Sequence, residues 1–179
     1  MATQIFSDMV MEEAIKDKTI EMKKQMKDFP GLNLVTTVYG DDLSDKSYRE
    51  AQGILTSHPE VKVIVAPTTV GVLAASQAVK DAGKIGQVYV TGLGLPSEMA
   101  GAIKSGATKE FAIWNPIDLG YSATQIAYHL VKGDAKGKPG SEIEAGRMGK
   151  IKIDDKGEAA MSDPFVYNAS NIDQFSKVF

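Results

Sequence analysis

Polar and aromatic side chains follow four short runs rich in β-branched residues, and these are the residues that could do chemistry. The runs end in loops at residues 39–42, 67–69, 93–96 and 114–118. In an open α/β sheet a ligand binds beyond the carboxyl ends of the strands, so the four loops would face one site. Trp114 offers an aromatic face, and the hydroxyl, amide and carboxylate groups around it can pair with hydroxyls. This combination favours a sugar. The alternative is that Trp114 packs in a core and Asn115 caps a turn.

Other chemistries fit the same sequence less well. Gly92 to Ser97 begins like a dinucleotide-binding loop, but Ser97 stands where the third glycine belongs. Asp41, Asp42 and Asp45 lack the spacing and the terminal glutamate of a calcium loop, so they indicate a solvated turn with a helix cap. We therefore expect no metal site and no cofactor.

The histidines and the candidate serine nucleophile give no catalytic constellation. His58 precedes a proline at a predicted helix end and His129 lies on another helix, so the sequence gives neither a partner for general-base work. Ser122 lies inside a predicted helix and does not match the nucleophile-elbow pattern. We expect that the chain is not an enzyme.

The elements that position the loops alternate between strand and helix. The β-branched runs cover residues 33–39, 61–67, 87–92 and 110–115, which is the spacing of a strand, a helix and two short loops. Apolar residues recur at helical spacing between the runs. The predicted helix ends are marked by Ser44 or Asp45, Thr68 or Thr69, Pro96, Gly83, Gly106 and Gly133. The predicted fold class is α/β, with three layers (α/β/α) and a mainly parallel sheet.

The ends of the chain depart from this alternation. Residues 8–28 read as one charged helix whose methionines pack against a core, closed by Pro30. Residues 134–149 read as loops, and residues 150–154 and 164–166 as short strands. We expect a single α/β domain over residues 1–179.

Composition excludes several classes of protein. The 179 residues are 43% hydrophobic and 24% charged, as in a globular domain that can bury a core without disulfides. Twenty basic and twenty-three acidic residues, without a long basic run, argue against a nucleic-acid or anionic-membrane partner. The chain has no cysteine, no apolar run approaching 18 residues and no signal-peptide pattern at residues 1–8.

Five segments carry a resemblance to a known family. They read VTTVYGDD at 35–42, VKVIVAPTTVGVLAASQAV at 61–79, VTGLGLPSEM at 90–99, EFAIWNPIDLGY at 110–121 and FVYNASNIDQF at 165–175. Together they resemble the type I periplasmic sugar-binding proteins of ABC transporters, in particular the rhamnose-binding and autoinducer-2-binding branches. The resemblance runs from about Glu21 to the C-terminus, and residues 1–20 do not align.

The resemblance implies a flavodoxin-like lobe that binds a small sugar without catalysis, works in the periplasm or outside the cytoplasm, and delivers its ligand to an ABC permease. Beside Trp114, it implies sugar contacts at Thr68, Thr69, Leu93, Gly94, Leu95, Asn115, Pro116 and Asp118. Thr68 stands where the autoinducer-2 branch has an aspartate, which favours a sugar such as rhamnose.

Members of the family have two lobes, and this chain is long enough for about half of such a receptor. The helix at 118–132 would then lack its partner lobe, yet it keeps an apolar stripe at Leu119, Ala123, Ile126, Ala127 and Leu130. We expect a homodimer through this helix. Two alternatives stay open: a flavodoxin-like or nucleotide-binding enzyme, and a self-associating domain with no ligand.

Overall fold

A computed structural model describes Ile20 and residues 22–179. Its contacts divide the chain into two compact units, one formed by Met1–Phe111 with Tyr167–Phe179 and the other by Ala112–Val166. We call them unit 1 and unit 2 and describe each by itself. The single domain over residues 1–179 stays a prediction.

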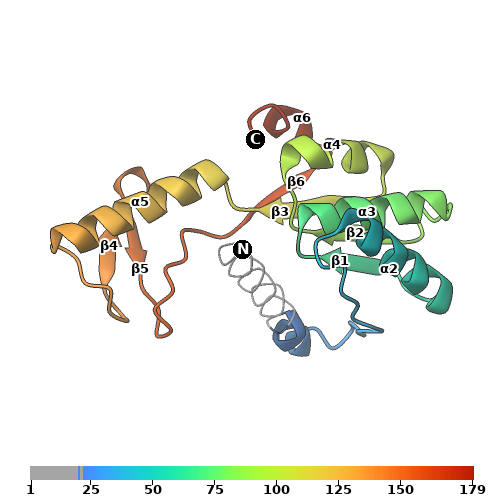
Figure 1. The fold of residues 1–179 in the computed structure, drawn as a ribbon, viewed down its shortest axis with the longest axis horizontal. Helices are drawn as coiled ribbons and strands as arrows, with labels where there is room; N and C mark the ends of the chain where they lie inside the picture. Colours follow the sequence, from blue (N-terminus) through green and yellow to red (C-terminus); the bar gives the residue numbers. More distant parts are fainter. Residues whose placement is uncertain (1–19, 21) are drawn as a thin grey trace, which may run out of the picture. The chain divides into compact units, whose positions relative to one another are not determined.

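Unit 1 is built on a parallel strand pair covered by helices. Strand β1 (Val63–Ala66) pairs with β2 (Tyr89–Gly92) in a register that places Val63 opposite Tyr89 and Ala66 opposite Gly92. Helix α3 (Thr69–Asp81) packs on both strands, and α2 (Ser44–Ser57) packs on α3 (Figure 1). Helix α4 (Pro96–Ser105) lies against α3 and against the short α6 (Ile172–Phe175). The α/β class and the parallel pairing are those predicted.

A second two-stranded ladder joins β3 (Glu110–Ile113) to β6 (Phe165–Asn168). The chain passes from one unit to the other within these two strands. Along the chain, residues 167–179 therefore belong to unit 1 again and follow all of unit 2.

Four predicted helix ends are confirmed. The Thr68 side chain caps α3 by accepting the backbone N–H of Gly71 at 3.0 Å, and Pro96 opens α4. Gly106 and Gly133 close α4 and α5 with φ of 79° and 82°, a left-handed conformation that costs glycine nothing. The predicted cap of α2 is wrong, because Leu43 holds the cap position without a side-chain bond, and Ser44 and Asp45 are already helical.

The first predicted strand, at residues 33–39, is also wrong. These residues form no strand and pair with no other part of the described chain, and Leu34, Val38 and Tyr39 are 38–49% exposed. A β-branched run becomes a strand only where a neighbour can take up its backbone groups. The helix predicted at residues 8–28 lies mostly outside the described residues. Its described end is helical at 22–25 and continues as a 3-10 turn, η1 (Met26–Asp28), just before Pro30.

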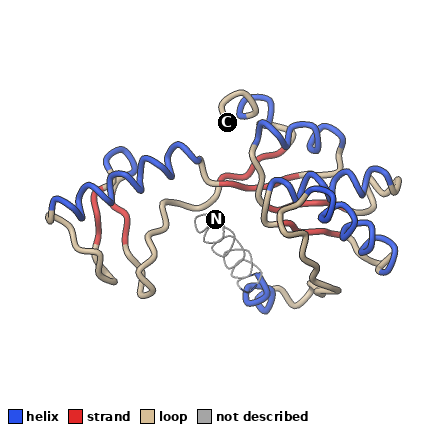
Figure 2. The backbone as a smooth tube through the Cα atoms, in the orientation of Figure 1, coloured by secondary structure: helices blue, strands red, loops and turns tan. Residues whose placement is uncertain are grey.

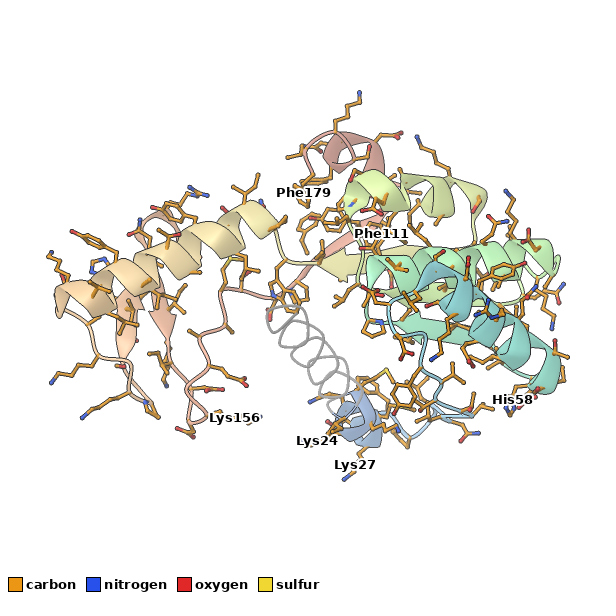
Figure 3. All side chains as sticks on the ribbon, viewed as in Figure 1. Lys24, Lys27, His58, Phe111, Lys156 and Phe179 are labelled. Atoms are coloured by element: carbon orange, nitrogen blue, oxygen red, sulfur yellow. The ribbon has the colours of Figure 1, made fainter. Side chains whose placement is uncertain are left out.

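The core of unit 1 joins α3, α4 and the strands to the C-terminal segment. Val72, Val79, Val90 and Met99 are completely buried. The Tyr167 ring stacks on Phe111 at 5.3 Å between centroids and meets Phe175 and Phe179 edge-on at 5.2 and 6.3 Å (Phe111 and Phe179 are labelled in Figure 3). Since aromatic side chains bury the most apolar area per residue, this cluster attaches residues 167–179 firmly to unit 1.

Unit 2 is one helix on a small hairpin. Helix α5 (Pro116–Lys132) packs on β4 (Glu142–Glu144) and on the 3-10 turn η2 (Gly146–Met148), which leads to β5 (Lys150–Lys152) (Figure 2). Strands β4 and β5 are antiparallel, and they bury the apolar side chains Ile143, Ala145, Ile151 and Ile153. The strand predicted at 150–154 is present over Lys150–Lys152, and the structure adds β4 within the stretch predicted as loops. Among the described helices, none combines the length and apolar character needed to span a bilayer.

Candidate functional site

The loops after β1 and β2 bring five of the predicted site residues together in unit 1. The hydroxyl oxygen of Thr69, after β1, accepts the backbone N–H of Leu95, after β2, at 3.1 Å. The backbone N–H of Leu93 donates to the carbonyl of Ala66, the last residue of β1, at 3.1 Å. Thr68, Thr69, Leu93 and Leu95 are half-buried, and Gly94 is buried. The two loops therefore form one continuous surface at the carboxyl ends of the parallel strands.

Glycine is the residue at two crowded positions beside these loops, Gly92 and Gly94. Gly92 has φ of 145°, and a Cβ atom there would lie 1.7 Å from the carbonyl oxygen of Ala66. A Cβ atom on Gly94 would lie 2.6 Å from Cγ of Met99. A side chain at position 92 would collide with a backbone atom of β1. The close approach of β1 to the end of β2 therefore requires glycine at this position. Gly92 and Gly94, which resemble the start of a dinucleotide-binding loop in the sequence, therefore have a packing role in this structure.

In unit 2, Asn115 and Pro116 form the start of α5. The Asn115 side-chain oxygen accepts the backbone N–H of Ile117 at 2.9 Å and that of Asp118 at 3.4 Å, and Pro116 is the first helical residue. The alternative role for Asn115, a cap, is thus present. Its Nδ2 amide donates to no atom in the part of the chain that the structure describes, so both of its hydrogens are available to a ligand.

Trp114 does not pack in a core. Its side chain is 36% exposed, and its indole N–H donates to the carbonyl oxygen of Ser162 at 2.7 Å. This bond fixes the ring through its polar edge and leaves part of the ring accessible. An indole held in this way can stack on the C–H face of a sugar.

Asp118 is engaged by a residue that sequence reasoning missed. Arg147 in η2 directs Nε and Nη2 to the same carboxylate oxygen of Asp118, at 3.2 and 2.6 Å, and its guanidinium lies 3.9 Å from the centre of the Tyr121 ring. The pair is separated by 29 residues. The only local signals around Arg147 are Gly146 and Gly149, which predict a turn and not an ion pair.

The first loop and the histidines add contacts of another kind. Asp41 and Asp42 both have left-handed φ, 52° and 55°, and Asp41 forms an ion pair with Lys46. His129, for which the sequence gave no partner, is bonded through Nδ1 to Asp134 at 2.8 Å, and His58 lies 3.4 Å from Glu60. Asp134 also pairs with Lys132, so this group closes the C-terminal end of α5 rather than activating a nucleophile.

Hydrogen bonding explains what the predicted site residues can do. The side-chain oxygens of Thr68, Thr69 and Asn115 already accept backbone N–H groups. What these side chains offer outward is chiefly hydrogen: two hydroxyl protons and one amide NH2 group. Each unit thus presents neutral donors that can bind oxygen atoms of a ligand.

Comparison with known sequences supports the same reading. The sequence profile described as "Periplasmic binding protein domain" matches residues 5–135. Proteins of this family bind ligands outside the cytoplasm and are not enzymes.

Three solved structures share the fold. A sugar ABC transporter protein from Actinomyces odontolyticus is 40% identical, with 86% of this chain and 50% of that chain covered and a TM-score of 0.74. An ABC transporter solute binding protein from Clostridium phytofermentas with bound L-rhamnose is 38% identical, with 88% and 54% covered and a TM-score of 0.78. LsrB from Clostridium saccharobutylicum in complex with AI-2 is 18% identical, with 88% and 53% covered and a TM-score of 0.74, a likeness of fold alone.

The chain spans about half the length of the solved structures that it matches. The predicted α/β class and the predicted resemblance are both confirmed by these matches. The chain belongs to the periplasmic binding protein domain family and has the type I periplasmic binding protein fold.

Proposed function

We propose that this chain binds a monosaccharide as part of a sugar-specific solute-binding protein of an ABC transporter. The observation that carries the proposal is the 38% identity, over 88% of the chain, to a protein with bound L-rhamnose. Within unit 1, the proposed sugar-contacting surface is formed by the Thr68–Thr69 and Leu93–Leu95 loops. Within unit 2, we propose a separate sugar contact at Trp114 and Asn115. The physiological partner is an ABC permease, and the place of action is outside the cytoplasm.

L-rhamnose is the ligand that we propose first. It is a neutral deoxy sugar, so it needs hydrogen-bond donors for its oxygens and an apolar surface for its methyl group and C–H faces. In unit 1, the hydroxyls of Thr68 and Thr69 supply neutral donors, and Leu93 and Leu95 supply apolar contact. In unit 2, the Asn115 amide and the partly exposed Trp114 offer the same two kinds of contact. A hydroxyl at Thr68 also places no negative charge beside the ligand.

The affinity should reflect the length of this chain relative to its relatives. A chain that offers about half the contacts of a full receptor leaves many sugar hydroxyls in water. We expect a Kd of about 1 mM or weaker for the isolated chain, which corresponds to roughly 4 kcal/mol of binding free energy.

The test is a titration followed by tryptophan fluorescence, because Trp114 is the single tryptophan in the chain. L-rhamnose should change the emission saturably, whereas sucrose, a disaccharide, at the same osmolarity should not. Equal and unsaturable responses to both sugars would refute the proposal.

A second proposal concerns self-association through α5. Its exposed side chains Leu119, Ala123, Ala127 and Leu130 and the half-buried Ile126 carry no charge, and Leu119 and Leu130 are 51% and 39% exposed. A second copy would bring the same uncharged face, so pairing about a two-fold axis creates no like-charge contact. Sedimentation equilibrium should give twice 19.2 kDa at tens of micromolar, and Leu130→Asp should halve that mass. A 19.2 kDa species at that concentration would contradict the dimer.

A further inference from the structure

We infer that Arg147 is a positioning residue for Asn115, acting through Asp118 and the first turn of α5; the inference rests on the proposed sugar-binding role of Asn115. The Asn115 cap, the Asp118 carboxylate, the Arg147 guanidinium and the η2 turn all lie within unit 2.

Asp118 is the connection between the cap and the guanidinium. Its backbone N–H donates to the Asn115 side-chain oxygen at 3.4 Å, while its own carboxylate oxygen accepts Nε and Nη2 of Arg147 at 3.2 and 2.6 Å. The carboxylate is 26% exposed, so the ion pair is partly shielded from water. Any displacement of Asp118 changes the position of the N–H that orients the Asn115 side chain.

Arg147 is in turn held on two further sides. Its guanidinium stacks 3.9 Å from the centre of the Tyr121 ring, and its backbone N–H donates to the Tyr121 hydroxyl at 3.4 Å. Tyr121 and Asp118 lie three residues apart on α5 and therefore on the same side of the helix. A planar guanidinium can stack on the ring and bond the carboxylate together, which a lysine ammonium cannot do.

The turn before Arg147 closes directly on this ring. Gly146 has φ of 57°, and a Cβ atom there would lie 2.1 Å from the Tyr121 hydroxyl oxygen. The backbone of η2 thus contacts Tyr121 of α5 next to Arg147. The Arg147 backbone is therefore held beside Tyr121, which brings its guanidinium within reach of both the ring and the Asp118 carboxylate.

The consequence for the site is a fixed direction for the Asn115 amide. Because the Asn115 oxygen is bonded to the first-turn N–H groups, the Nδ2 group on the other side of the amide must point away from the helix. Arg147 keeps that first turn in place without itself contacting the ligand. Loss of Arg147 should loosen the cap and blur the direction of the two donors.

The experiment compares Arg147→Gln and Arg147→Lys with Lys150→Gln as matched control. Lys150 is a cation of the same hairpin whose contacts to Glu142 and Glu144 are long, 3.8 Å each. Two quantities are measured: amide hydrogen exchange at Ile117 and Asp118, with Ile126 in mid-helix as internal reference, and the L-rhamnose Kd by Trp114 fluorescence.

Both Arg147 variants should speed exchange at Ile117 and Asp118 by about two- to fivefold and raise the Kd by a similar factor, as expected for a half-exposed ion pair with a stacking contact. Exchange at Ile126 should not change, and Lys150→Gln should alter neither quantity. Unchanged exchange at Ile117 and Asp118 would overturn the inference, as would faster exchange with an unchanged Kd. If the unsubstituted chain binds no sugar, the proposed function fails, while faster cap exchange still supports positioning of Asn115 by Arg147.

Discussion

Replacing Asn115 by aspartate separates its two roles, as a helix cap and as a hydrogen-bond donor to a sugar. Aspartate keeps a side-chain oxygen in the position that accepts the N–H groups of Ile117 and Asp118 at 2.9 and 3.4 Å. It replaces the amide NH2, which is not used within the described chain, by a second oxygen. The matched variant Asn115→Ala removes both functions.

The size of each effect follows from these contacts. Asparagine and aspartate are about equal at a cap, whereas alanine costs about 1 kcal/mol there, or roughly 2–4 °C in Tm for a chain of this length. The new negative charge is favoured at the α5 N-terminus by about 0.3–1 kcal/mol and opposed by the nearby Asp118, so Asn115→Asp should change stability by less than about 1 kcal/mol. Both variants lose the donors, which should cost about 1–3 kcal/mol of binding, or roughly 5- to 150-fold in Kd.

Thermal denaturation and a rhamnose titration by Trp114 fluorescence measure the two effects separately. We expect a normal Tm with weakened binding for Asn115→Asp, and a lowered Tm with weakened binding for Asn115→Ala. Normal binding by Asn115→Asp together with weak binding by Asn115→Ala would show that only the cap matters. That result would refute the assignment of the Asn115 amide to the ligand.

Three further substitutions test the packing and the electrostatics. Ser122→Ala should leave the Tm unchanged or raise it. The buried Ser122 hydroxyl has no hydrogen-bond partner among the described residues, and a buried unsatisfied hydroxyl costs about 1–3 kcal/mol. A clearly lower Tm in a thermal melt would contradict this. Tyr167→Ala should lower the free energy of unfolding, measured by urea denaturation, by about 3–5 kcal/mol, because it removes the central ring of the aromatic cluster. A loss below about 1 kcal/mol would show that the core does not need the C-terminal segment. The hydrogen bond from Lys104, and then its charge, lower the pKa of Asp173. The stability from this pair is therefore present above the unfolded-state pKa and is lost as the pH falls through the folded-state pKa. The acid limb of the stability curve should flatten in Asp173→Asn and not in Asp163→Asn, whose carboxylate forms no ion pair within the described part of the chain.

Local signals in the sequence were enough to predict most of the elements. Thr68 at the start of α3, Pro96 at the start of α4 and the glycines at 106 and 133 mark helix ends because each satisfies a requirement of the backbone at that position. The run at 33–39 satisfies the composition of a strand but finds no partner in the described chain. Strand formation depends on a neighbour, and a sequence window does not contain the neighbour.

The candidate site was predictable as a set of loops and not as a set of contacts. The position of Thr69 and Leu95 after neighbouring strands follows from the parallel topology. The bond between Asp118 and Arg147 spans 29 residues, and that between Trp114 and Ser162 spans 48. Neither partner has a residue type or spacing that marks it in advance, so only the folded structure shows which side-chain atoms are already used and which remain for a ligand.

The most direct test of the sugar-binding claim is two-dimensional NMR of the chain titrated with L-rhamnose. We expect saturable shifts, with a Kd of about 1 mM or weaker, at the backbone amides of Thr68, Thr69 and Leu95 in unit 1. Within unit 2, we expect a saturable shift at the side-chain amide of Asn115. Saturable shifts confined to other residues would contradict the proposed surfaces. The absence of any saturable shift at up to about a hundredfold higher sugar concentration would contradict sugar binding by this chain itself.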